Sequence, residues 1–242
     1  MTRNEIIDIL KKEANPDKIL LKEAKFGITS NNALGIYHKE LKMIAKEIGT
    51  NYELALQLFD SGIYEARLLC SKIFKPKNIT ESLMEKWVVT FENWEICDSF
   101  SMGLFAKSDF ALAKILEWTN RKAEFEKRAG FAILASYCMA DKKSDNELFE
   151  QFFPIIIQQA TDDRLYVKKA VNWALRNLGK RNIDLNLMAI ETANEILKFN
   201  TKSAKWIAKN ALAELQKEGI RMSDYPRSVY RKPVANNFYK NY

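Results

Sequence analysis

The chain has 242 residues, of which 47% are hydrophobic and 29% are charged, proportions that suit a folded globular protein and exclude disorder throughout. Its formal net charge of +7 at pH 7 and its pI near 9.1 favour a polyanionic partner such as nucleic acid. The single histidine excludes multi-histidine metal sites and disfavours a Ser-His or Cys-His catalytic pair, so we expect any general base to be a carboxylate.

The cysteines and the amino terminus indicate the cellular context. Cys70, Cys97 and Cys138 lack the spacing of a disulfide framework or a zinc site. The first residues include acids where a signal peptide has an apolar run, and no uncharged apolar stretch approaches about 18 residues. We therefore expect a cytoplasmic protein with no membrane segment, no metal and no cofactor.

Helical periodicity accounts for almost the whole chain, and no alternating strand pattern competes with it. The first helix is predicted over 2–14, followed by a break at 15–17, another helical stretch and a loop over 27–32. The later helices are predicted over 36–48, 51–60, 62–74, 109–119, 123–140, 145–159, 163–179, 185–198 and 202–217.

Two further helices are expected from their capping signals. Ser82 and Glu85 have the spacing of a capping box for the helix that carries Trp87. Asn93 is expected to cap the next helix, which carries Trp94 and Asp98.

The sequence resembles itself at steps of roughly 40 residues with two helices each, as in HEAT and armadillo repeats. Residues 167–180 align with 204–217, and Arg128-Ala129 aligns with Lys169-Ala170. The predicted fold is therefore an all-α solenoid of antiparallel helix pairs forming one domain over 1–218. A basic, tyrosine-containing tail follows over 219–242, either as a loosely docked end or as a second DNA contact.

The predicted helix over 163–179 separates its apolar and cationic residues onto opposite faces. Lys169, Arg176 and Lys180 gather on the side away from the aliphatic residues, with Trp173 beside them. One interpretation is a tryptophan covering the helix edge among solvated lysines. The other is a surface for an anionic polymer, in which the cations meet phosphates and the ring meets a base or sugar.

A second pattern places an indole beside a carboxylate. Trp94 and Asp98 are four residues apart and share a helix face, so together they can hold a cation, the ring adding about 0.5–2 kcal/mol. The alternative is a packing tryptophan beside a structural aspartate. Arg128 lies on the face that a solenoid helix turns inward, where a guanidinium needs a structural carboxylate, a phosphate or Asp98 as its partner.

Three motifs in order carry a resemblance to a known family. The runs NWEICD at 93–98, KRA at 127–129 and VKKAVNWALR at 167–176 resemble the AlkD-type DNA alkylation repair proteins, and the resemblance extends over about 25–217. It implies a right-handed solenoid of HEAT-like repeats. The characterised enzymes of this family are monofunctional DNA glycosylases that release cationic alkylated purines.

The resemblance also implies roles for individual residues. Asp98 resembles the catalytic carboxylate of the family, Trp94 and Trp173 resemble the two indoles that line its lesion site, and Arg128 resembles the arginine beside them. Asn93 departs from members that have a second tryptophan there. The cations expected to bind DNA phosphates are Arg128, Lys168, Lys169, Arg176 and Lys180.

The expected function is therefore a DNA glycosylase acting as a monomer on double-stranded DNA with bases such as 3-methyladenine and 7-methylguanine. A cationic purine is already a good leaving group, so an anionic Asp98 need only stabilise the oxocarbenium-like sugar. Two alternatives stay open. One is a non-catalytic solenoid that binds damaged or structured DNA, and the other is a protein-binding scaffold.

Overall fold

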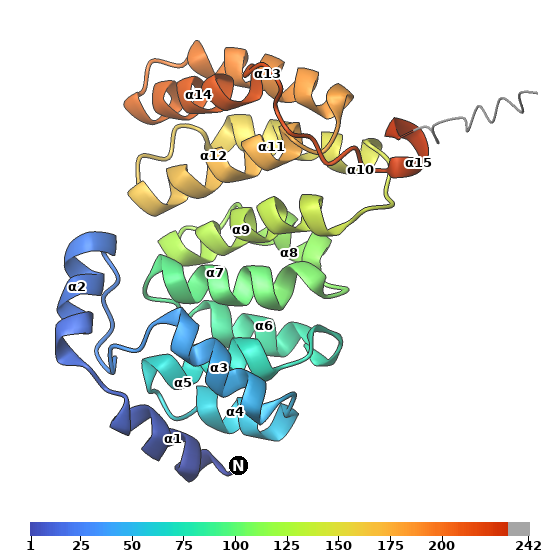
Figure 1. Ribbon diagram of the computed structural model, residues 1–242. Coiled ribbons are helices and arrows are strands. Elements are labelled where there is room, and N and C mark those ends of the chain that lie inside the picture. The colour runs from blue at the N-terminus through green and yellow to red at the C-terminus, as the bar shows by residue number, and fades with distance from the viewer. Residues whose placement is uncertain (232–242) are drawn as a thin grey trace, which may run out of the picture.

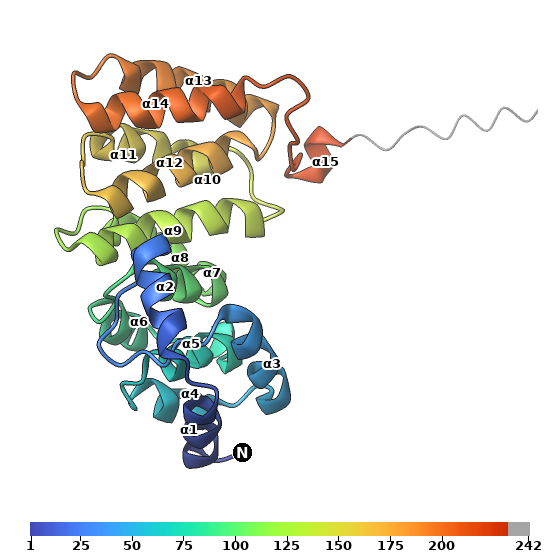
Figure 2. The same cartoon turned by 60° about the vertical axis from the view of Figure 1, so that its left-hand side comes forward.

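A computed structural model describes residues 1–231, which contain fifteen α-helices and two short 3-10 helices and no β-strand. Figures 1 and 2 show the helices stacked in layers, one above another, with α2 at the edge of the stack. The predicted all-α solenoid is confirmed. None of the described helices is both long enough and apolar enough to cross a membrane.

Five consecutive helix pairs build most of the stack. They are α4 (Tyr52–Phe59) with α5 (Tyr64–Ile73), α6 (Glu81–Val88) with α7 (Trp94–Gly103), α8 (Ala111–Trp118) with α9 (Glu124–Ala140), α11 (Phe152–Gln159) with α12 (Leu165–Gly179), and α13 (Ile183–Leu197) with α14 (Lys202–Leu215). The second helices α5, α7, α9, α12 and α14 contact one another in succession. We call them the second-helix layer.

The remaining elements lie at the ends of the stack or between pairs. α3 (His38–Ile48) packs on α5 and so extends the second-helix layer at its amino-terminal end. The others are α1 (Arg3–Lys12), α2 (Pro16–Phe26), η1 (Pro76–Asn78), η2 (Phe105–Lys107), α10 (Glu147–Glu150) and α15 (Arg227–Tyr230).

Most predicted helices agree with the structure to within two residues at each end, and the exceptions have local causes. α6 is capped by Thr80 rather than Ser82, because the Thr80 hydroxyl accepts the Leu83 N–H at 3.2 Å. The single helix predicted over 145–159 is divided into α10 and α11. Pro154 lies in the first turn of α11, where its missing N–H is tolerated, whereas it would break one continuous helix.

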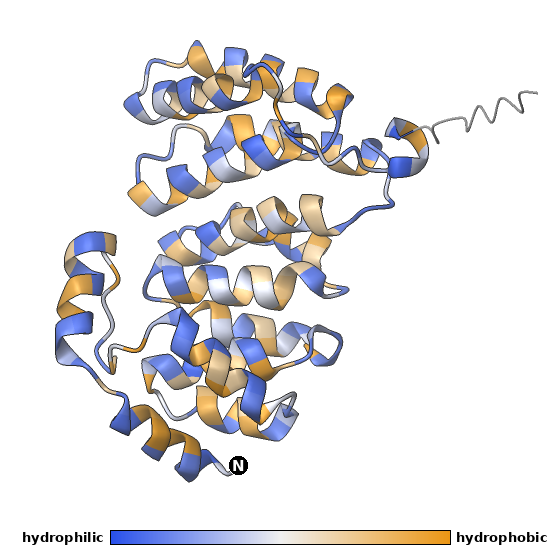
Figure 3. Cartoon of the chain, viewed as in Figure 1, coloured by the Kyte–Doolittle hydropathy of each residue, from blue (hydrophilic) through white to orange (hydrophobic). Residues whose placement is uncertain are grey.

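The core lies between the helices, because the helices of the five pairs bury apolar residues against one another; Figure 3 shows these residues along the stack. Trp87 and Trp118 are fully buried. The Trp87 ring packs 5.2 Å from the Phe100 ring of α7, measured between centroids, so an aromatic cluster joins α6 to α7. Trp206 lies at the edge of the stack with 38% of its surface exposed.

The first part of the predicted tail is docked on the solenoid. The Ser223 N–H donates to the Lys180 carbonyl at 2.9 Å, and the Asn182 amide donates to the Tyr225 carbonyl at 2.7 Å. Packing therefore continues past the boundary predicted at 218. The rest of that tail, 232–242, lies outside the described residues.

The loop before α3 is held by a buried carboxylate. Glu65 of α5 is fully buried and accepts the backbone N–H groups of Leu34, Gly35 and Ile36 at 2.7, 2.9 and 3.2 Å. These three N–H groups lie in a loop and have no carbonyl partner in any described helix or strand, so the carboxylate accepts their hydrogen bonds instead. Glu65 thereby fixes the chain that leads from α2 into α3.

We predict that Glu65→Ala lowers the free energy of unfolding by at least about 2 kcal/mol, because it leaves backbone donors unpaired in the interior. Urea unfolding monitored by circular dichroism measures the change. Glu191→Ala, which removes an exposed carboxylate from α13, is the matched control and should change stability by less than about 0.5 kcal/mol. Equal effects of the two substitutions would contradict this role for Glu65.

Candidate active site

Arg128 connects three helices of the second-helix layer through a bidentate ion pair with Asp98 and a hydrogen bond to a backbone carbonyl. Arg128 of α9 donates from Nε to Oδ1 of Asp98 at 2.9 Å and from Nη2 to Oδ2 at 2.7 Å. Its remaining nitrogen, Nη1, donates to the backbone carbonyl of Tyr166 in α12 at 2.7 Å. The side chains of Arg128 and Asp98 are only 7% and 17% exposed, so the pair is largely removed from water.

The charge state of Asp98 depends on this arginine. Burial raises the pKa of Asp98, and the positive charge and hydrogen bonds of Arg128 oppose that rise. Each carboxylate oxygen also accepts one hydrogen bond from Arg128. A cation that approaches Asp98 therefore meets a carboxylate whose charge is already partly compensated.

Asp98 and Arg128 border a cavity of about 530 Å³ where the amino-terminal ends of α7 and α12 meet α9 and the end of α2. The backbone after α2 closes one side of it. The Trp94 indole N–H donates to the Phe26 carbonyl at 2.8 Å, and the Tyr166 hydroxyl donates to the Gly27 carbonyl at 3.2 Å. The cavity is lined by Lys25, Phe26, Gly27, Trp94, Asp98, Arg128, Leu165, Tyr166 and Lys169.

The structure brings Trp94, Asp98 and Arg128 together, and it places Trp173 elsewhere. The second aromatic side chain that lines the cavity is Tyr166. Trp173 lies seven residues later on the same face of α12, roughly 10 Å further along the helix axis, where it is half-buried against the core. The sequence signal for Tyr166 was its place on the stripe of Lys169 and Trp173.

The cations predicted to bind phosphates differ in how far they are already paired. Lys169 is exposed, lines the cavity and makes no ion pair with residues 1–231. Arg176 and Lys180 both bind the Glu214 carboxylate of α14, the latter at 2.6 Å. The positive charge of α12 is thus partly neutralised at its carboxyl-terminal end, where Arg176 and Lys180 lie.

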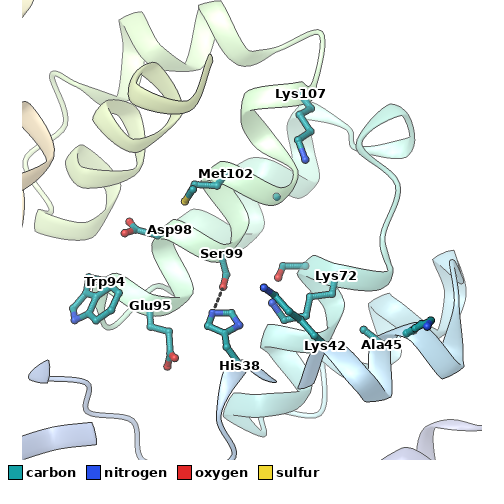
Figure 4. A pocket seen from close by; sticks show the side chains of 13 residues that line it. His38, Lys42, Ala45, Lys72, Trp94, Glu95, Asp98, Ser99, Met102 and Lys107 are labelled. Atoms are coloured by element: carbon teal, nitrogen blue, oxygen red, sulfur yellow. Dashed lines mark hydrogen bonds between the residues drawn. The ribbon is translucent and has the colours of Figure 1, made fainter. Parts of the chain in front are cut away.

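Lys168 and His38 occupy sites that the helix pattern did not indicate. Lys168 lies with its Nζ 5.7 Å from the centre of the Trp206 ring, away from the cavity. His38, the single histidine, is half-buried with Nε2 3.4 Å from the Ser99 hydroxyl (Figure 4). It lines a second cavity that also touches Asp98.

These features define the class of protein. It is a helical-repeat solenoid whose second-helix layer presents an indole, a carboxylate held by a guanidinium, and the exposed Lys169 around one cavity. The family described as DNA alkylation repair enzyme matches residues 6–215, and the chain belongs to this family. The predicted resemblance to AlkD-type proteins is confirmed.

Solved structures share the fold. One, from a family related to the HEAT-like repeat DNA glycosylases with affinity for branched DNA structures, matches with a TM-score of 0.75 and 18% identity, covering 92% of this chain and 98% of that one. AlkD2 from Streptococcus mutans matches with a TM-score of 0.55 and 20% identity over 81% of this chain and 96% of that one. The pairs are therefore HEAT-like repeats.

A relative in sequence is an uncharacterised protein of Listeria innocua. It is 24% identical over 186 residues, which cover 75% of this chain and 81% of the relative.

We predict that Arg128→Gln lowers the free energy of unfolding by about 3–5 kcal/mol at pH 7, because it strands a buried carboxylate. The deficit should be smaller at pH 5. Without Arg128, burial raises the pKa of Asp98 in the folded state above its unfolded value, so lowering the pH protonates Asp98 preferentially in the folded protein.

Urea unfolding at the two pH values tests this prediction. The double variant Asp98→Asn, Arg128→Gln should recover part of the loss, and Arg3→Gln, at an exposed position in α1, is the control for loss of an arginine. Losses that simply add in the double variant would show that the two side chains are not coupled.

Proposed function

We propose that this protein binds duplex DNA over its second-helix layer and hydrolyses the N-glycosidic bond of cationic alkylated purines, such as 3-methyladenine and 7-methylguanine. The observation that carries the proposal is the convergence of Trp94, Asp98 and Arg128, from two different helices, on one cavity. Membership in the DNA alkylation repair enzyme family supports the same substrate class.

Release of a cationic alkylated purine requires few catalytic groups from the protein. A purine alkylated at N3 or N7 leaves without protonation, so the site needs no general acid. As the bond breaks, the sugar acquires positive charge, which the Asp98 carboxylate stabilises and the Trp94 ring face supports. Arg128 holds the carboxylate in place, and its charge opposes the rise in the pKa of Asp98 that burial causes.

Tyr166 takes the place of a second indole in this proposal. It lines the cavity opposite α7, and its ring packs 5.5 Å from that of Phe125, which fixes its position. Trp173 then contacts DNA further along α12 rather than the damaged nucleotide. Lys169 is the best supported phosphate ligand, because it borders the cavity and has no carboxylate partner among residues 1–231. Arg176 and Lys180 contribute less net charge, since Glu214 binds both.

One observation favours a second candidate, a non-catalytic solenoid that binds damaged or structured DNA. Both oxygens of Asp98 accept hydrogen bonds from Arg128, so the carboxylate stabilises a developing cation less than an unpaired one would. The fold relative whose family has affinity for branched DNA structures is consistent with this alternative. In both candidates DNA lies over the same face.

We predict that Asp98→Asn lowers the single-turnover rate of 7-methylguanine and 3-methyladenine release from methylated duplex DNA by about 100-fold, because the substitution removes the negative charge. The dissociation constant for the same duplex should change by less than about threefold, since the cations bind phosphates independently of Asp98. Asp109→Asn, at an exposed position before α8, is the control and should leave the release rate unchanged.

The outcomes separate the two candidates. Salt-dependent DNA binding by a wild-type protein that releases neither base would establish the non-catalytic alternative. Release that survives Asp98→Asn would show instead that the catalytic carboxylate lies elsewhere.

A further inference from the structure

The second cavity that touches Asp98 holds a concentration of positive charge that the proposed reaction does not use. It has a volume of about 700 Å³ and lies between α3, α5, α7 and η2. Four lysines line it, from three of these elements: Lys42 and Lys46 of α3, Lys72 of α5, and Lys107 of η2. In Figure 4 the side chains of Lys42, Lys72 and Lys107 extend toward the space beside His38.

This charge is only partly compensated within the part of the chain that the structure describes, by the nearby Glu95. None of the four lysines forms an ion pair there, and the two carboxylates that line the cavity are bound to other cations. Glu95 pairs with the buried Lys22 at 2.6 Å, and Asp98 pairs with Arg128. In Figure 4 the Asp98 carboxylate also points away from the lysines. The cavity is therefore strongly cationic.

Lys72 and His38 are half-buried, and the pKa of each is lowered. Burial and the nearby charge of Lys42 lower the pKa of Lys72 to about 8. Burial and Lys72 also lower the pKa of His38. The Nδ1 atom of His38 is buried and has no hydrogen-bond partner among residues 1–231, and Nε2 lies 3.4 Å from the Ser99 hydroxyl.

We propose that this cavity binds a phosphate group, with Lys72 and His38 at its inner end and Lys42 and Lys107 at its rim. Four lysines without ion-pair partners among residues 1–231 favour an anion of high charge, and lysine ammonium groups bind phosphate oxygens as point charges. His38 lines the same cavity and adds a further positive charge there when it is protonated.

The position of the cavity indicates which phosphate it takes. Asp98 borders both cavities, and Ser99, the next residue of α7, lies in the phosphate cavity. A DNA strand whose damaged nucleotide lies at Asp98 thus places a neighbouring phosphodiester within reach of Lys72. The assignment of this phosphate to DNA rests on the DNA binding proposed above. The proposal that the cavity binds a phosphate group does not depend on it.

His38 is the only histidine, so its imidazole resonances in an untagged protein report on this cavity alone. Several charged groups face it: Lys22 from α2, Lys42 from α3, Lys72 from α5 and Glu95 from α7, with Ser99 as its hydrogen-bonding neighbour. A bound phosphate favours the imidazolium, so the pKa of His38 should rise when inorganic phosphate is added at constant ionic strength.

The first experiment titrates the protein with inorganic phosphate and follows the His38 resonances by NMR. We expect a saturable shift and a raised pKa for wild type, both weakened at least about tenfold in apparent affinity by Lys72→Gln or by the exposed-site variant Lys42→Gln. Lys198→Gln, which removes an exposed lysine from the end of α13, should behave as wild type. No saturable shift in wild type, or equal shifts in all variants, would overturn the phosphate site.

The second experiment tests whether the phosphate belongs to DNA. The salt dependence of duplex binding is measured for the same proteins, and loss of one phosphate contact should reduce the slope of log K against log salt by about 0.9 in Lys72→Gln and not in Lys198→Gln. An unchanged slope beside a positive phosphate titration would overturn the assignment to DNA and leave a site for free phosphate. A protein that fails to release bases but passes both tests would contradict the proposed catalysis and leave the phosphate site intact.

Discussion

The contact on which the site depends is the ion pair between Arg128 and Asp98. A buried arginine or aspartate without its partner costs several kcal/mol, so α7 and α9 must pack in the register that brings the two side chains together. The third bond of the guanidinium, to the Tyr166 carbonyl, extends the constraint to α12. Three successive repeats are thereby fixed around one cavity, and the backbone after α2 completes it through hydrogen bonds from Trp94 and Tyr166.

The cations of the second-helix layer fall into two groups. Some form ion pairs with carboxylates of the protein, and others form none in the described part of the chain and can bind a ligand. Glu214 binds Arg176 and Lys180, so these two side chains chiefly join α12 to α14. Lys169 and the lysines of the phosphate cavity have no such partners within residues 1–231. The available positive charge thus lies on the second-helix layer on both sides of Asp98, as a surface that follows a phosphate backbone requires.

The fold was largely predictable because its signals are local. Apolar periodicity and short breaks located the helices, and the cap at Asn93 was identified from its own sequence neighbourhood. The site was only partly predictable. Trp94 and Asp98 share one helix face, but whether Tyr166 or Trp173 reaches the cavity depends on how α12 is placed against α7. The partners of His38 and Lys180 lie on other repeats, far along the chain, and helical periodicity does not specify such contacts.

The measurement that tests this account most directly is amide hydrogen exchange with and without duplex DNA, followed by mass spectrometry. We predict slower exchange on DNA binding in α7, in the amino-terminal half of α12 and in α3, all of which line the two cavities. Exchange in α11 and α13, which belong to the other layer, should not change. Protection confined to α11 and α13, or DNA binding with no protection of α7, would contradict the placement of DNA over Asp98.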